Sequence, residues 1–268
     1  MLGRLVGDLM KAHTTNKRAF LAVSCLMLAA GCGQELDVGS DVLWTARFEG
    51  NSFAEWTSVG GSDNASSGDV IELSSEYAYQ GKYAAKLTIT APSVNPQGSG
   101  SGLARQGNLP TQAYYSAWYY LPSKVAVGIY WVIMKFRYRT VVDDSSTEGE
   151  LFDLNLKNLP SGDMSLRLYD HRMGDLPLDV ADPIVPAGNN VWFQVEAFYR
   201  DDAVDGQLTL WLDGKQILDW KGPTGPTPWV AWDVVSVGEN LNPATALLYV
   251  DDCAISQSRV GLTGLIAK

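Results

Sequence analysis

Short runs of alternating apolar and polar residues fill the chain from Val42 onward, and they are rich in Val, Tyr, Trp, Phe and Thr. A period of two predicts β-strands, and Gly, Asn, Asp and Pro separate the runs as turn residues do. The same region has no long amphipathic helical pattern. The predicted strands are Val42–Glu49, Asp69–Leu73, Tyr83–Thr90, Tyr114–Leu121, Ile129–Arg139, Glu150–Lys157, Met164–His171, Trp192–Arg200, Gln207–Leu212, Trp232–Gly238 and Leu247–Ser256.

Eleven strands at this spacing, without intervening helices, favour an all-β fold in which two antiparallel sheets form a sandwich. Asp213-Gly214 predicts a two-residue hairpin turn, because both residue types tolerate a positive φ. Three acidic or Gly- and Pro-rich segments are expected to be loops at the rim of the sandwich. They are Asn95–Gly102, Asp143–Glu150 and Lys221–Pro228.

The first 31 residues have the pattern of an export signal. Lys11, Lys17 and Arg18 precede the apolar run Ala19–Ala30, which at about a dozen residues is shorter than the about 20 that a transmembrane helix needs. The run ends at Ala30-Gly31-Cys32, which resembles a bacterial lipobox, although Ala29 stands where that pattern usually has Leu. This resemblance implies a signal peptide over residues 1–31, lipidation of Cys32 and a tether over residues 32–41. An ordinary signal peptide with a chance cysteine is the alternative.

Without its first 31 residues the chain is strongly acidic. Those residues carry a net charge of +3, so the remainder carries −13 against −10 for the whole chain. Such a charge argues against nucleic acid as a partner. Only Cys32 and Cys253 are left as cysteines, and lipidation would occupy the first, so we expect no disulfide.

Six segments of this chain recur in the same order in concanavalin A-like jelly-roll domains. They are Phe48-Glu49-Gly50 with Trp56, Gly81–Ala85, Trp118–Pro122, Trp192–Glu196, Asp205-Gly206 with Trp211–Gly214, and Tyr249–Asp252. The series most resembles jelly-roll polysaccharide lyases, of the alginate, glucuronan and heparin lyase kind. The resemblance implies a jelly-roll domain over residues 42–260, a C-terminal tail over 261–268, and a concave sheet whose groove holds a polysaccharide.

Alternation along each strand separates a core face from a groove face. Aromatic rings in such a groove stack on sugar rings, and basic side chains pair with carboxylate or sulfate, so we expect an anionic polysaccharide. The alternative is that the tryptophans lie in the core and the basic residues form a solvated face. The residues expected to bind substrate are Arg105, Trp118, Trp131, Lys135, Arg137, Arg167, Glu196 and Trp211.

A lyase must neutralise the uronate carboxylate, remove the C5 proton and protonate the leaving oxygen. Lys135-Phe136-Arg137 stands where the similar lyases have Gln, an aromatic residue and His, so their histidine is missing here. Arg105 resembles the arginine of their Arg-Ser-Glu strand, but Gln106-Gly107 follows it. The catalytic candidates are therefore Tyr169 as base and acid, His171 beside it, and Arg137 or Arg167 on the carboxylate. A purely structural role for His171 is the alternative.

Hydrolytic chemistry has weaker support in the sequence. Glycoside hydrolysis needs two facing carboxylates, and a regular strand would place Glu150 and Asp153, three residues apart, on opposite faces. No motif of serine hydrolases, zinc proteases or nucleotide-binding enzymes is present.

The resemblance to jelly-roll domains also implies a structural calcium ion between the first and last strands. In those domains the ligands are an acid after the first strand's Phe, carbonyls near a Gly-x-x-Ala turn and an Asp of the terminal pair. Glu49, the Gln80–Lys82 backbone and Asp251 match these places, and oxygen ligands suit a hard cation. The alternative is that these acids cap a turn.

These patterns together predict an outer-membrane lipoprotein, held in the membrane through Cys32, whose jelly roll binds a polysaccharide. A lyase that cleaves uronate-containing glycans is the enzymatic alternative. A protein-binding adhesion module is the third, because a fold does not fix a function.

Overall fold

The computed structural model describes residues 41–61, 69–91, 98–107, 109–142, 145–225 and 230–263. The predicted signal peptide, Cys32 and nearly all of the tether lie outside the described residues, as do the last five residues of the tail. The described residues form sixteen β-strands and no helix, so no helix among them could cross a membrane.

The first sheet contains both ends of the domain, since strand β1 pairs with the last strand, β16. All its pairings are antiparallel. In spatial order its strands are β14 (Lys215–Lys221), β13 (Gln207–Leu212), β12 (Phe193–Arg200), β6 (Gln112–Tyr120), β16 (Thr245–Ser256), β4 (Ala84–Thr90) and β3 (Val70–Ser74), with β1 (Val42–Ala46) beside β16.

The second sheet is built on two long strands, β7 and β8, and is also antiparallel throughout. Its strands in order are β10 (Gly174–Leu176), β9 (Met164–Asp170), β8 (Ser145–Asn158), β7 (Ala126–Val142), β15 (Val230–Asn242), β5 (Ser99–Arg105) and β2 (Ser58–Gly61), with β11 (Ile184–Val185) beside β9. Two antiparallel sheets, with no helix among the residues that the structure describes, confirm the predicted all-β sandwich.

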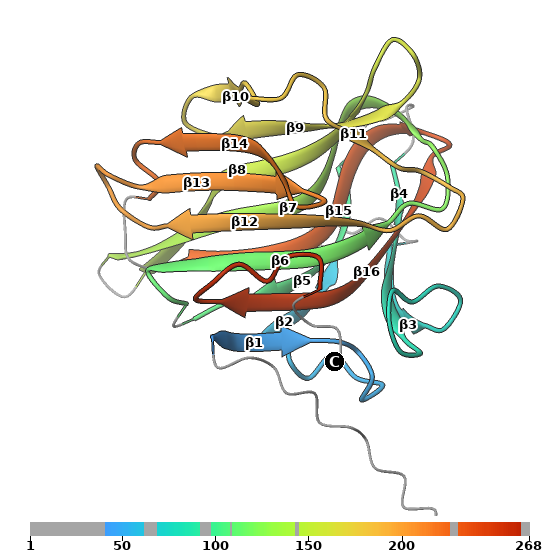
Figure 1. Cartoon of the computed structure of the whole chain (residues 1–268), viewed down its shortest axis with the longest axis horizontal. Helices are drawn as coiled ribbons and strands as arrows, with labels where there is room; N and C mark the ends of the chain where they lie inside the picture. The colour runs from blue at the N-terminus through green and yellow to red at the C-terminus, as the bar shows by residue number, and fades with distance from the viewer. Residues whose placement is uncertain are drawn as a thin grey trace, which may run out of the picture. The chain divides into compact units, whose positions relative to one another are not determined.

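The core lies between the two sheets, which face one another in Figure 1. Phe136 of β7 stacks on Tyr199 of β12 with ring centroids 4.5 Å apart, and Tyr115 of β6 meets Phe136 edge-on at 5.2 Å. Trp232 of β15 and Trp131 of β7 are fully buried in the same core. Burial of these large rings, which removes much apolar area from water, is the main stabilising contribution to the sandwich.

All eleven predicted strands are present, with ends shifted by a few residues. The Asp213-Gly214 hairpin is confirmed, because both residues have positive φ, 47° and 75°, between β13 and β14. Two loop predictions are wrong in part, because β5 begins at Ser99 and β8 begins at Ser145. The glycines of β5 allow close packing instead of a loop: a β-carbon at Gly102 would lie 2.6 Å from Val235 Cγ1.

Candidate functional site

Two adjoining pockets hollow the outer face of the second sheet. The first, of about 520 Å³, lies over β7, β8 and β9, and the second, of about 460 Å³, lies over β5, β7 and β15. Lys135, Glu150 and Val237 line both pockets, so the two form one groove across the sheet. We call this surface the groove.

A β-bulge in β7 decides which of its side chains face the groove. Val132 pairs with Asn155 and Met134 pairs with Leu154, which leaves Ile133 as an extra residue on β7. An extra residue reverses the alternation of the strand beyond it. Val132 and Lys135 therefore line the groove, whereas Trp131 is fully buried and donates an Nε1 hydrogen bond of 2.9 Å to Ser236 Oγ. The prediction that Trp131 binds substrate is wrong for this reason.

A second bulge, in β8, brings two acids onto one face. Arg137 pairs with Glu150 and Phe136 pairs with Phe152, so Leu151 is the extra residue. Leu151 and Phe152 both lie in the core, and Glu150 and Asp153 both line the groove. Their spacing of three residues therefore does not separate them, and the predicted placement on opposite faces is wrong. Two consecutive apolar residues between two acids were the available sign of the bulge.

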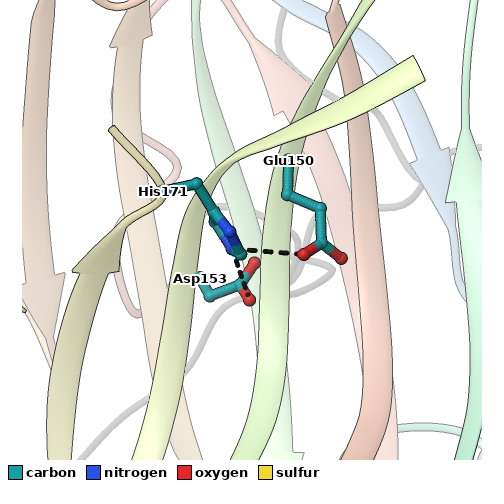
Figure 2. A group of neighbouring side chains, drawn as sticks. All are labelled: Glu150, Asp153 and His171. Carbon is teal, nitrogen blue, oxygen red and sulfur yellow. Dashed lines mark hydrogen bonds and ion pairs between the residues drawn. The ribbon is translucent and has the colours of Figure 1, made fainter. Parts of the chain in front are cut away.

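His171 is held against these acids by the same bulge. Its backbone N–H donates a 3.0 Å hydrogen bond to the carbonyl of Leu151. Figure 2 shows its ring directed at both carboxylates, with Nε2 3.0 Å from Asp153 Oδ2 and 3.2 Å from Glu150 Oε2. Lys135 completes the group, because its ammonium pairs with Glu150 Oε1 and lies 3.8 Å from Asp153 Oδ2.

The charges of this group shift two pKa values in opposite directions. The hydrogen bond to Asp153, together with the charges of both acids, raises the pKa of His171 against the opposing effects of burial and of Lys135. Burial of Glu150 disfavours its anion, but the attraction of Lys135, with His171 and Arg137, outweighs burial and lowers the pKa of Glu150. The site therefore favours a charged imidazole beside a charged Glu150.

Tyr169 and Arg167 of β9 extend the site along the first pocket. The ring of Tyr169 stands edge-on to that of His171, with centroids 5.1 Å apart. The guanidinium of Arg167 lies 5.7 Å from the Tyr169 centroid and pairs with Asp175. Four of the predicted residues, Lys135, Arg167, Tyr169 and His171, are thus brought together.

Arg137 lies in the second pocket and makes a two-point ion pair with Asp233 of β15, with Nη2 3.1 Å from Oδ1. Each basic side chain of the groove therefore has an acidic neighbour: Asp233 beside Arg137, Asp175 beside Arg167 and Glu150 beside Lys135. A ligand carboxylate would have to compete with these acids.

Three predicted residues lie on the other sheet. Glu196 of β12 is fully buried and accepts hydrogen bonds from Arg259 Nε at 2.7 Å and Val260 N at 2.6 Å. Arg259 covers Trp211 with its guanidinium 4.2 Å from the ring centroid. Trp118 of β6 stacks on Tyr79 at 3.8 Å. Alternation predicts the face of a strand but not its sheet, so the placement of these residues in the groove was wrong.

Arg105 is in the correct sheet but points away from the groove. Its guanidinium lies 5.6 Å from the ring centroid of Trp44, and Nη1 donates to Thr57 Oγ1 at 3.3 Å. The prediction that Arg105 binds substrate is therefore wrong as well. The groove instead contains Tyr130 and Asn155, which the sequence analysis missed. Asn155 could have been found, because it lies two residues after Asp153 on the same strand face.

Glu49 and Asp251, the expected calcium ligands, accept backbone hydrogen bonds. Glu49 Oε1 accepts from Lys82 N at 2.8 Å, and Asp251 Oδ2 accepts from Tyr79 N at 2.8 Å. Burial and the neighbouring Asp252 raise the pKa of Asp251 to about 8. Asp252 Oδ1 pairs with Arg47, but the buried Oδ2 of Asp252 has no hydrogen-bond partner among the described residues. A buried acidic pair with an unsatisfied oxygen fits the donor set of a hard cation.

No protein-family model and no curated protein matches the sequence. Among solved structures, the endo-β-1,4-glucuronan lyase of the fungus Trichoderma reesei has a TM-score of 0.58 at 14% identity, covering 81% of this chain and 96% of that one. The catalytic domain of a glycoside hydrolase family 131 protein from Coprinopsis cinerea has a TM-score of 0.51 at 14% identity, with 82% and 96% covered. A variant of alginate lyase Aly36B, in complex with an alginate trisaccharide, has a TM-score of 0.50 at 13% identity, with 81% and 98% covered. These likenesses confirm the predicted resemblance to jelly-roll polysaccharide lyases as a likeness of fold.

Proposed function

We propose that this protein binds an anionic polysaccharide in the groove. The observation that carries the proposal is the row of Tyr169, Arg167, Lys135 and Arg137 along two adjoining pockets of one sheet face. A tyrosine ring offers a stacking surface for a sugar, and cations offer partners for its carboxylates. Similar folds that act on glucuronan and alginate, by their names, support a glycan as the ligand.

The basic side chains of the groove already form ion pairs with acidic side chains, which favours a ligand with many carboxylates over a single sugar acid. Each carboxylate that binds displaces or shares an acidic side chain such as Asp175 or Asp233, so one contact contributes little. A polymer engages both pockets at once, and its second contact is intramolecular, which raises the overall affinity.

Titration calorimetry with alginate, glucuronan, pectate and heparin, with neutral xylan as the control, tests this function. We expect binding of at least one anionic polymer, weakened by salt, and weaker binding of xylan. Binding of none of these glycans would overturn the proposal and favour the protein-binding adhesion module.

β-Elimination in the same groove is the second candidate, and the contact of Tyr169 with His171 favours it. In this reaction a base removes the C5 proton, the electron pair forms the C4–C5 double bond, and the C4–O bond breaks. Tyr169, as its phenolate, would take the proton and become the neutral phenol, and Arg167 would stabilise the carboxylate on which charge develops. His171, with its raised pKa, would protonate the leaving oxygen. New ultraviolet absorbance from unsaturated ends during incubation with the polymers would identify a lyase.

A calcium ion at Glu49 and Asp251 belongs to the same proposal as a structural cofactor. Its support is the buried, incompletely satisfied pair Asp251 and Asp252, whose negative charge a cation would offset. Calcium should raise the melting temperature after treatment with EDTA, and Asp251→Asn should abolish this increase. An equal increase in both proteins would place the ion elsewhere.

Export and attachment to the outer membrane through Cys32 are also proposed, on the lipobox resemblance alone. Membrane-fraction labelling with a radioactive fatty acid should give a labelled chain that Cys32→Ala removes. Equal labelling of both chains would contradict the anchor.

A further inference from the structure

Three potential metal ligands converge at the centre of the groove. Glu150 and Asp153 come from β8, and His171 directly follows β9. One ligand atom of each residue lies within 4.8 Å of the others, and the histidine nitrogen lies between the two carboxylates (Figure 2). The β8 bulge and the backbone bond from His171 to Leu151 fix this convergence before any ligand binds.

Asp153 adds an independent sign of a missing partner. Its side chain is only 6% exposed and is directed into the cluster. Although Oδ2 contacts His171, the buried Oδ1 has no hydrogen-bond partner among the described residues. A buried carboxylate oxygen without a partner is costly, and a cation bound by both oxygens of Asp153 would remove that cost.

The distances from the imidazole nitrogen to the two acids are compatible with a shared metal. Ligands bound at about 2.1 Å lie about 3.0 Å apart at right angles and about 3.4 Å apart at the tetrahedral angle. The distances from His171 Nε2 to the two acids, 3.0 and 3.2 Å, fall in this range. Lys135 lies beside this place: its ammonium binds Oε1 of Glu150 and lies 3.8 Å from Asp153 Oδ2, whereas the imidazole faces Oε2 of Glu150.

We propose that Glu150, Asp153 and His171 bind one divalent transition metal whose remaining coordination positions open into the groove. One imidazole and two carboxylates suit Zn²⁺ or Mn²⁺ better than Ca²⁺, which prefers oxygen ligands alone. A metal-bound imidazole is neutral, so with Lys135 included the four side chains then carry a net charge of −1, and the metal reverses its sign. On the proposed function above, the open positions take carboxylate or hydroxyl oxygens of the bound polysaccharide.

Titration calorimetry of the full chain with Zn²⁺, after removal of metals with EDTA, tests the site without any glycan. We expect Asp153→Asn and His171→Gln to weaken Zn²⁺ binding by about 100-fold or more, because a ligand is lost. Asp175→Asn, which changes the acidic partner of Arg167 outside the three ligands, should leave the affinity unchanged. Zn²⁺ bound instead by Cys25 and Cys32 would give the same binding signal in all of these variants, because none of them changes a cysteine. Equal Zn²⁺ affinity in the original chain and both ligand variants, or no Zn²⁺ binding, would overturn the proposal.

Lys135→Gln gives a test that misfolding cannot imitate. Removal of the neighbouring ammonium should increase the Zn²⁺ affinity by about tenfold, because a like charge beside the metal is lost. A decrease, or no change, would count against a metal in contact with Glu150. Ca²⁺ that competes fully with Zn²⁺ here would also overturn the proposed class of metal.

Glycan titration with and without Zn²⁺ separates this inference from the proposed function. We expect Zn²⁺ to tighten the binding of anionic polymers in the original chain and to have no effect in Asp153→Asn. Zn²⁺ binding without any glycan binding would leave the metal site standing and overturn the proposed function. Glycan binding that ignores Zn²⁺ would overturn the contact between metal and sugar.

Discussion

Asp153 Oδ2 lies 3.0 Å from His171 Nε2, and one extra residue in β8, Leu151, positions both side chains. The bulge turns Asp153 toward the same face as Glu150, and its free carbonyl accepts the backbone N–H of His171. A bulge beside a functional site is a common means of re-aiming side chains. The group of acids and imidazole is therefore a property of the backbone, fixed before ligand binds.

The first prediction concerns the protonation of His171 in the metal-free chain. Its pKa should lie above the ordinary value of about 6.5, because Asp153 and Glu150 favour the imidazolium. Asp153→Asn should lower that pKa. Histidine resonances followed by NMR against pH measure both values, and His171→Gln assigns the signal, since the chain has only two histidines. An unchanged pKa in Asp153→Asn would contradict the contact.

Tyr169 allows stacking and proton transfer to be separated. Tyr169→Phe keeps the ring, so glycan affinity should change by less than about threefold, whereas Tyr169→Ala should weaken it by about tenfold. If the protein is a lyase, Tyr169→Phe should abolish the appearance of unsaturated ends while binding persists. Equal affinities in the Phe and Ala variants would exclude stacking on this ring.

Trp131→Ala should act on stability and not on the groove. The indole is fully buried and hydrogen-bonded to Ser236, so its removal should lower the free energy of unfolding by about 3–5 kcal/mol. Urea unfolding measures this loss. Trp211→Ala is the matched control on the other sheet, and neither variant should change glycan affinity while folded. A loss of binding in folded Trp211→Ala would move the binding surface to the first sheet.

The strands were predictable because apolar and polar residues alternate in the sequence wherever a strand has one buried and one exposed face. The glycines of β5 were misleading, because small residues also mark loops. Here Gly100 and Gly102 lie against Val237 and Val235, where a β-carbon would come within 2.9 and 2.6 Å of a methyl group. The fold therefore followed from the pattern, except where glycine serves packing.

The site was less predictable because it depends on two further properties. A single extra residue, Ile133 in β7 or Leu151 in β8, reverses which side chains face the groove along the rest of the strand. Two consecutive apolar residues are the only sign of it in the sequence. The second property is the sheet to which each strand belongs. β9 and β13 each carry polar faces, but only β9 joins the grooved sheet, so Tyr169 and Trp211 lie on different surfaces.

The last prediction is that the free energy of unfolding depends on pH through the titration of Asp201, which is not one of the proposed metal ligands. This carboxyl is partly buried, its Oδ1 has no hydrogen-bond partner among the described residues, and burial with the neighbouring Asp202 raises its pKa to about 6. The folded state then holds the proton more tightly than the unfolded chain, whose pKa is about 3.9. Stability should therefore fall as the pH rises from about 4 to 6, by about 1 kcal/mol after allowance for partial exposure.

Asp201→Asn should remove this decline, so the variant should match the original chain near pH 4 and exceed its stability at pH 7. Asp202→Asn provides the opposite control. Asp202 accepts hydrogen bonds from the amides of Asp205 and Val204, which lower its pKa, so its substitution should destabilise the chain at neutral pH. Urea unfolding of the three proteins at several pH values measures these differences. Parallel curves for the original chain and Asp201→Asn would contradict the prediction, because an uncharged amide cannot reproduce the titration of a carboxyl.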